Sequence, residues 1–88
     1  MRRRMERQKI IELIEEVADD FYQNQNAEGI KKMPELVKKL ADIAETMNQE
    51  ERKKYCMAMK NLADAYEQKN YVMVADGLTF EIIKIVGK

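Results

Sequence analysis

The chain has 88 residues, of which 45% are hydrophobic and 36% charged, and its 16 basic residues balance 16 acidic ones. This length fits one small domain over residues 1–88, and the composition is typical of a compact helical protein. Histidine is absent, which excludes the common zinc sites and the catalytic triads that need an imidazole. The lone Cys56 permits no intrachain disulfide, and no apolar run approaches the length of a membrane span, so we expect a cytoplasmic protein.

The N-terminal residues form a short basic segment, with five cations against one anion in the first nine positions. Such an arm, with Arg2, Arg3 and Arg4 at its start, can grip phosphate or an acidic protein surface. A solvated, frayed terminus over residues 1–5 is the alternative. We favour the frayed terminus, because the chain as a whole is neutral and has no basic face lined by aromatic residues.

A first helix is predicted over residues 5–24. Its apolar stripe follows a three- and four-residue spacing and consists of Ile10, Ile14, Val17 and Phe21, flanked by Ile11, Ala18 and Tyr22. The other face is acidic and could chelate a divalent cation through carboxylates one turn apart. No glycine-bearing calcium loop accompanies those carboxylates, so we predict a solvated face, without a metal or cofactor site.

A second helix is predicted over residues 27–47. Its apolar stripe consists of Ile30, Met33, Val37, Leu40, Ala44 and Met47. Pro34 either occupies the first turn of this helix or kinks a longer one that begins near Ala27. Folded back antiparallel, the helix would bring its lysines beside the acidic end of the first helix. The expected partners are Lys31, Lys32, Lys38 and Lys39 with Glu15, Glu16, Asp19 and Asp20.

A third helix is predicted over residues 49–68. Asn48 serves as its N-cap and Glu51 stands at the third helical position, which is a variant of the capping box. The residues predicted to be buried are Tyr55, Ala58, Met59, Leu62, Ala65 and Tyr66. Cys56 falls on the flank of that stripe, so we predict a packed and unreactive thiol.

The last stretch, residues 70–86, is apolar nearly all round when wound as a helix. One face carries Tyr71, Val74, Ala75, Leu78, Ile82, Ile85 and Val86. The opposite face carries Val72, Met73, Phe80 and Ile83. A helix with this pattern is usually buried on several sides or shared with a partner.

The same stretch admits a β-hairpin that turns at Asp76–Gly77, because both residues tolerate the positive φ of a type I′ turn. The fold would then be three helices plus a C-terminal hairpin. No other part of the chain predicts a strand that would complete a sheet, so we favour the helix. Gly77 would be tolerated inside that helix if a neighbouring helix approached closely there.

The run KNYVMVADGLTFEI resembles the C-terminal signature of small, uncharacterised all-helical bacterial domains, in which Lys-Asp/Asn-Tyr-Val precedes Ala-Asp, Leu and Glu. The matching positions are Lys69, Asn70, Tyr71, Val72, Ala75, Asp76, Leu78 and Glu81. The resemblance covers about a sixth of the chain. It supports the helix over the hairpin and implies no biochemical activity.

These patterns predict an all-α fold, an up-down antiparallel bundle of four helices. We expect a non-enzymatic protein–protein interaction module, of adaptor or chaperone-like kind, that self-associates as a homodimer through its last helix. The predicted partner-binding residues are Val72, Met73, Phe80 and Ile83. The alternative is a small regulator that binds nucleic acid through its basic arm. No catalytic constellation or small-molecule site stands out, since an enzyme would have to rely on Glu, Asp, Tyr, Lys and Cys56 alone.

Overall fold

The computed structural model describes the backbone of residues 2–87 and the side chains of residues 7–87. Helices α1 (Arg2–Tyr22), α2 (Asn26–Ala44) and α3 (Gln49–Glu67) precede a last helix of three consecutive segments, α4 (Tyr71–Gly77), the π-helical η1 (Leu78–Ile82) and α5 (Ile83–Val86). No strand occurs in residues 2–87, so the four-helix prediction is confirmed and the hairpin at Asp76–Gly77 is wrong. The backbone of residues 2–5 belongs to α1, whereas the arginine side chains of the predicted arm, at positions 2 to 4, lie outside the described part.

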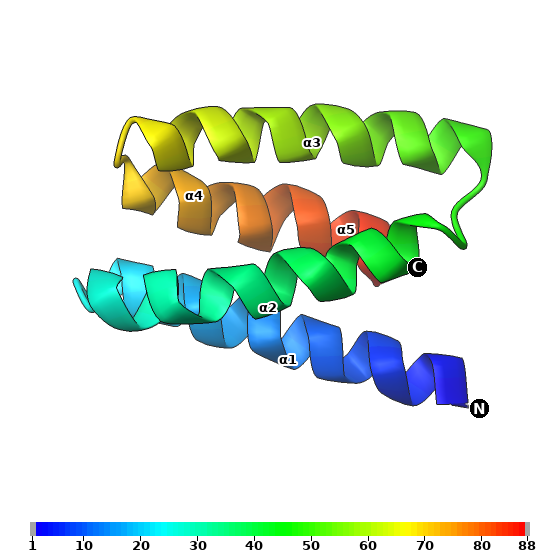
Figure 1. The fold of residues 1–88 in the computed structure, drawn as a ribbon, viewed down its shortest axis with the longest axis horizontal. Coiled ribbons are helices and arrows are strands. Elements are labelled where there is room, and N and C mark those ends of the chain that lie inside the picture. The colour runs from blue at the N-terminus through cyan, green and yellow to red at the C-terminus, as the bar shows by residue number, and fades with distance from the viewer. Residues whose placement is uncertain (1, 88) are drawn as a thin grey trace.

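The four helices run alternately up and down, with each consecutive pair antiparallel (Figure 1). Helix α1 packs against α2 on one side and against the last helix on the other, and α3 packs against the last helix. Helices α2 and α3 scarcely touch each other, although a short loop joins them. The central pair is therefore α1 with α4–α5, and α2 and α3 each cover one side of it.

One continuous hydrophobic core joins all four helices. The largest side chains that are fully buried are Phe21, Ile14, Leu36, Leu40, Leu78 and Ile82. The radius of gyration is 12.3 Å, close to the roughly 12 Å expected for a compact chain of this length. No helix within residues 2–87 is both long and apolar enough to cross a membrane.

The π turn keeps one face of the last helix against the core. Leu78, Ile82 and Val86 are spaced four residues apart and all are fully buried. In a regular α-helix, four residues advance roughly 40° beyond a full turn, so such a series would rotate away from the core. The wide turn, in which the Ile83 N–H donates to the Leu78 carbonyl, absorbs this drift.

Two helical glycines lie where another side chain comes close. A Cβ at Gly77 would lie 3.2 Å from Leu62 Cδ1, so α3 does approach the last helix at this point, as the sequence required. A Cβ at Gly29 would lie only 2.5 Å from Cε1 of Phe21, whose ring fills the space beside α2. The two glycines therefore allow α1 to pack on α2 and α3 to pack on α4.

The buried stripe of α2 differs from the predicted one. Ile30 and Val37 are exposed, and Leu36 and Ile43 are buried in their place. Because α3 scarcely contacts α2, only the side of α2 that faces α1 is covered. Pro34 lies inside a helix that begins at Asn26, which is the longer of the two helices considered.

Cys56 is exposed, so the prediction of a packed thiol is wrong. Its neighbours Tyr55 and Ala58 are buried. Position 56 is thus just outside the side of α3 that faces the core, a difference that periodicity alone does not resolve.

Local polar contacts confirm the predicted capping box and, for Lys32 alone, the predicted pairing of α2 lysines with α1 carboxylates. The Asn48 side chain accepts a hydrogen bond from the Glu51 N–H at 2.8 Å and the Glu51 carboxylate accepts one from the Asn48 N–H at 3.3 Å, which completes the capping box. Lys32 Nζ lies 2.7 Å from Asp20 and 3.0 Å from Glu16, across the α1–α2 pair, and these bonds raise the lysine pKa. Lys31 lies instead 3.8 Å from Glu28 on its own helix.

Candidate interaction site

The structure brings together two of the four residues predicted to bind a partner. Phe80 and Met73 are 60% and 56% exposed, and both line one groove between α3 and the last helix. Val72 is also exposed but does not line this groove. Ile83 is partly buried and packs against the core.

This groove, called here the α3–α4 groove, has a volume of about 450 Å³. One wall comes from α3 and its C-cap and consists of Asn61, Leu62, Asp64, Ala65 and Gln68. The other comes from α4 and η1 and consists of Met73, Asp76, Gly77, Phe80 and Glu81. Because Gly77 has no side chain, the groove stays open down to Leu62.

The start of α4 is held in place by the turn that precedes it. The Asn70 side chain accepts a hydrogen bond from the Met73 N–H at 3.4 Å, as an N-cap does. The Tyr71 ring stacks on Phe21 at 5.2 Å and meets the edge of Tyr66 at 6.0 Å between ring centroids. These contacts hold the first turn of α4 against both α1 and α3. Met73, which lies in this turn, therefore has a fixed backbone position at one end of the groove.

The α3–α4 groove is apolar at its centre and acidic along its walls. Asp64, Asp76 and Glu81 line it, and no lysine or arginine does. None of these three carboxylates forms a salt bridge with a side chain of residues 7–87. Asp76 accepts a hydrogen bond from the Tyr22 hydroxyl, and this bond raises the pKa of Tyr22.

The carboxylates of the groove are not arranged as a metal site. Within the described side chains, no three acidic or thiol groups are placed so that they could share an ion. Oxygen-ligated cations need several such oxygens converging at short range.

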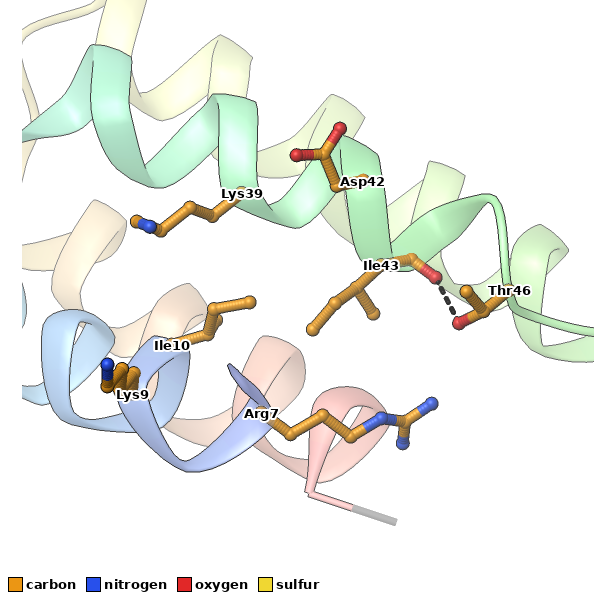
Figure 2. A pocket seen from close by; sticks show the side chains of 7 residues that line it. All are labelled: Arg7, Lys9, Ile10, Lys39, Asp42, Ile43 and Thr46. Atoms are coloured by element: carbon orange, nitrogen blue, oxygen red, sulfur yellow. Dashed lines mark hydrogen bonds between the residues drawn. The ribbon is translucent and has the colours of Figure 1, made fainter. Parts of the chain in front are cut away.

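A second cleft, shown in Figure 2, lies between the N-terminal half of α1 and the C-terminal half of α2 and has a volume of about 430 Å³. Ile10 and Ile43 point into it, and Arg7 and Lys39 extend from it in opposite directions. Arg7 donates a hydrogen bond to the Val86 carbonyl at 3.2 Å, which occupies part of its guanidinium. The three cations that line the cleft do not converge on one point, and the acidic Asp42 lines it with them.

A third depression separates α2 from α3 and is almost purely apolar, with a volume of about 390 Å³. Its lining consists of Met33, Pro34, Val37, Met59, Leu62, Ala63 and Tyr66. The depression exists because α2 and α3 scarcely touch. It carries no charged residue that would select one class of ligand.

The sequence pattern missed the α3 side of the α3–α4 groove. Asp64 lies on the polar side of α3 and Gln68 is the C-cap of that helix, one turn later, whereas Asp76 and Glu81 interrupt the apolar last helix. In the sequence, the only sign that these four residues line a groove is their spacing within each helix. Their juxtaposition depends on how α3 packs on α4, which a one-dimensional pattern does not contain.

Comparison with known proteins yields one match. No curated protein and no solved structure is detectably similar to this chain. Residues 8–88 match the family described as a domain of unknown function, DUF8042, which covers nearly the whole chain. The α3–α4 groove lies within that matched region, as does the cleft of Figure 2 apart from Arg7. The chain therefore belongs to the DUF8042 family.

Proposed function

We propose that this chain is a non-enzymatic interaction module that recognises another protein through the α3–α4 groove. The observation that carries the proposal is the exposure of Phe80 and Met73 in one groove, beside the fully buried face of the same helix. Large apolar side chains that remain exposed beside a cleft mark interaction sites more often than isolated ones do. Aromatic residues and methionine are also the types enriched where proteins meet.

The backbone beside these residues supports the same proposal. Phe80 and Glu81 belong to the π turn η1, and single π turns within α-helices occur frequently at functional sites. The turn leaves Leu78 and Ile82 on the core and Phe80 outside it. Phe80 thus contributes its exposed surface to a partner without weakening the packing of the helix.

The sequence pattern favoured a second copy of the chain as the partner. The carboxylates of the groove argue against a symmetric pair, because two such grooves placed face to face would bring negative charges together. We therefore propose a different protein as the occupant.

Site-specific photocrosslinking tests the proposal. Benzoylphenylalanine is placed at Phe80 in the native host, and, as the matched control, at Met57, which is 70% exposed and lines none of the three clefts. We expect discrete crosslinked species from position 80 and none from position 57. Crosslinks of equal strength from both positions, or none from position 80, would refute recognition through this groove.

Size-exclusion chromatography with light scattering tests whether the occupant is a second copy of the chain. A monomer at high micromolar concentration is the result that the proposal predicts. A dimer that Phe80→Glu dissociates, and Met57→Glu does not, would show instead that the groove binds a second copy.

A second candidate function is nucleic-acid binding by the basic N-terminal arm. The specific observation in its favour is the cleft of Figure 2, where Arg7, Lys9 and Lys39 stand beside the first turns of α1. Such binding would weaken steeply with salt and would be lost when residues 1–9 are removed. Retention of binding to a short duplex by Lys9→Glu/Lys39→Glu at low salt would count against any contribution from the cleft.

A further inference from the structure

We infer that the α3–α4 groove takes a basic amphipathic helix of a partner protein. This inference rests on the proposed function, because it names the chemical class of the segment that the groove recognises. Two properties of the groove lead to it, its shape and the distribution of its charges.

The shape fits a helix. The groove lies between the antiparallel helices α3 and α4–η1 (Figure 1), and a groove between two helices accommodates the apolar stripe of a third. Met73 and Phe80 stand seven residues apart, which corresponds to two turns and about 10 Å along the helix axis. Apolar residues of a partner helix at positions i, i+3 or i+4, and i+7 would span the same length.

The charges select a cationic helix. Asp64 stands on the α3 wall and Asp76 and Glu81 stand on the opposite wall, so both flanks of a docked helix would face carboxylates. Lysine and arginine lay their aliphatic chains along apolar surface and extend their charge to the rim, which suits this arrangement. Glutamate in the same places would meet like charge on both sides.

One of the carboxylates is already fixed in position. Asp76 is hydrogen-bonded to Tyr22 of α1, so less conformational freedom is lost when it binds a cation. Asp64 and Glu81 have no cationic partner among residues 7–87. The groove therefore presents negative charge that the fold itself does not neutralise.

Fluorescence anisotropy with two designed peptides tests the inference. Both peptides have about 18 residues, enough to form a helix, and share one leucine stripe. Their polar faces carry lysine in one peptide and glutamate in the other. We expect the lysine peptide to bind roughly tenfold more tightly at low salt, and the difference to shrink as salt is raised.

Matched charge variants locate the effect. Asp64→Lys/Glu81→Lys should weaken lysine-peptide binding about tenfold, whereas Glu12→Lys/Glu15→Lys, which changes the net charge equally on the exposed face of α1, should weaken it less than about threefold. The milder pair Asp64→Asn/Glu81→Gln should give a smaller loss in the same direction. Circular dichroism checks that all variants fold.

The outcomes separate this inference from the proposed function. Equal binding of the two peptides, no binding of the lysine peptide, or equal losses in the two lysine double variants would overturn the basic-helix inference. Crosslinking from position 80 would then still support recognition through the groove. Loss of that crosslinking would refute the proposed function, whatever the peptides do.

Discussion

The two faces of the last helix are both apolar, yet only one of them is covered by the rest of the chain. Leu78 and Ile82 are fully buried against α1 and α3, whereas Met73 and Phe80, a few residues away, are mostly exposed. Hydrophobicity alone therefore does not determine which face of this helix is buried in the core. The buried face is determined by the packing of α1 and α3 around the helix and by the π turn, which keeps Leu78, Ile82 and Val86 directed at the core.

The difference between the faces implies a division of tasks. Residues on the covered face contribute to folding stability in proportion to the surface that they bury. Residues on the open face cost little to replace in the isolated protein, so their apolar character needs another explanation. We propose that this explanation is a partner.

The largest expected loss of stability comes from truncating a side chain on the covered face. Ile82→Ala should lower the free energy of unfolding by about 2 to 5 kcal/mol, because it leaves a cavity in a fully packed core. Phe80→Ala should lower it by less than about 1 kcal/mol, since most of that ring is already in water. Urea denaturation followed by circular dichroism measures both. Similar losses of unfolding free energy in the two variants would mean that Phe80 is as important for the fold as Ile82, contrary to the burial described.

The two helical glycines should respond differently to substitution by alanine. Gly29→Ala should destabilise the fold by about 1 to 3 kcal/mol, because its methyl group would collide with the buried Phe21 ring. Gly77→Ala should be close to neutral, because Leu62 needs to give way only slightly and the gain in helix propensity, up to about 1 kcal/mol, offsets the strain. Thermal unfolding of the two variants compares them directly, and a more stable Gly29→Ala protein would contradict the packing described.

Alkaline pH should weaken the fold through its tyrosines. Burial raises the pKa of Tyr55 and Tyr66 above the ordinary 10.0, and the hydrogen bond to Asp76 raises that of Tyr22. A raised pKa means that the folded state holds the proton more tightly. The associated stability is fully present below pH 10.0 and is lost as the pH rises through the higher folded values. Melting temperatures between about pH 8 and about pH 11 should fall at the alkaline end, in step with tyrosinate absorbance.

The smallest effect is expected from Tyr22→Phe, at the end of α1. It removes one exposed hydrogen bond to Asp76 and should cost less than about 1 kcal/mol. It should also reduce the alkaline loss of stability, because one of the three shifted tyrosines is gone. An unchanged pH profile would mean that Tyr22 does not contribute to it.

Most of the fold could be predicted from residue patterns within each helix. The stripes of α1, α3 and the last helix emerged from the three- and four-residue spacing, and the capping box at Asn48 marked where α3 begins. The prediction that residues 70–86 form a helix followed from the lack of any other predicted strand with which a hairpin there could pair. Each of these features depends on residues that are close in sequence, which is why they were predictable.

What could not be predicted depends on which helices touch. The spacing of α2 placed Ile30 and Val37 in the core, but they are exposed because α3 leaves that side of α2 uncovered. The same limit applies to the candidate site. Exposure of Met73 and Phe80 followed from the two-faced last helix, whereas the opposing wall with Asp64 required the packing of α3 on α4.

We propose that a partner helix binds the open face of the last helix, in the groove lined by Asp64, Asp76 and Glu81. The most direct test of this proposal is a ¹H–¹⁵N NMR titration of the whole chain with the lysine-faced peptide. If the peptide binds in the α3–α4 groove, the amide shifts should change most at Asn61, Asp64, Met73, Gly77, Phe80 and Glu81, and amides around Ile10 and Ile43 should be unaffected. Changes centred on the depression between α2 and α3, or the absence of any, would contradict it.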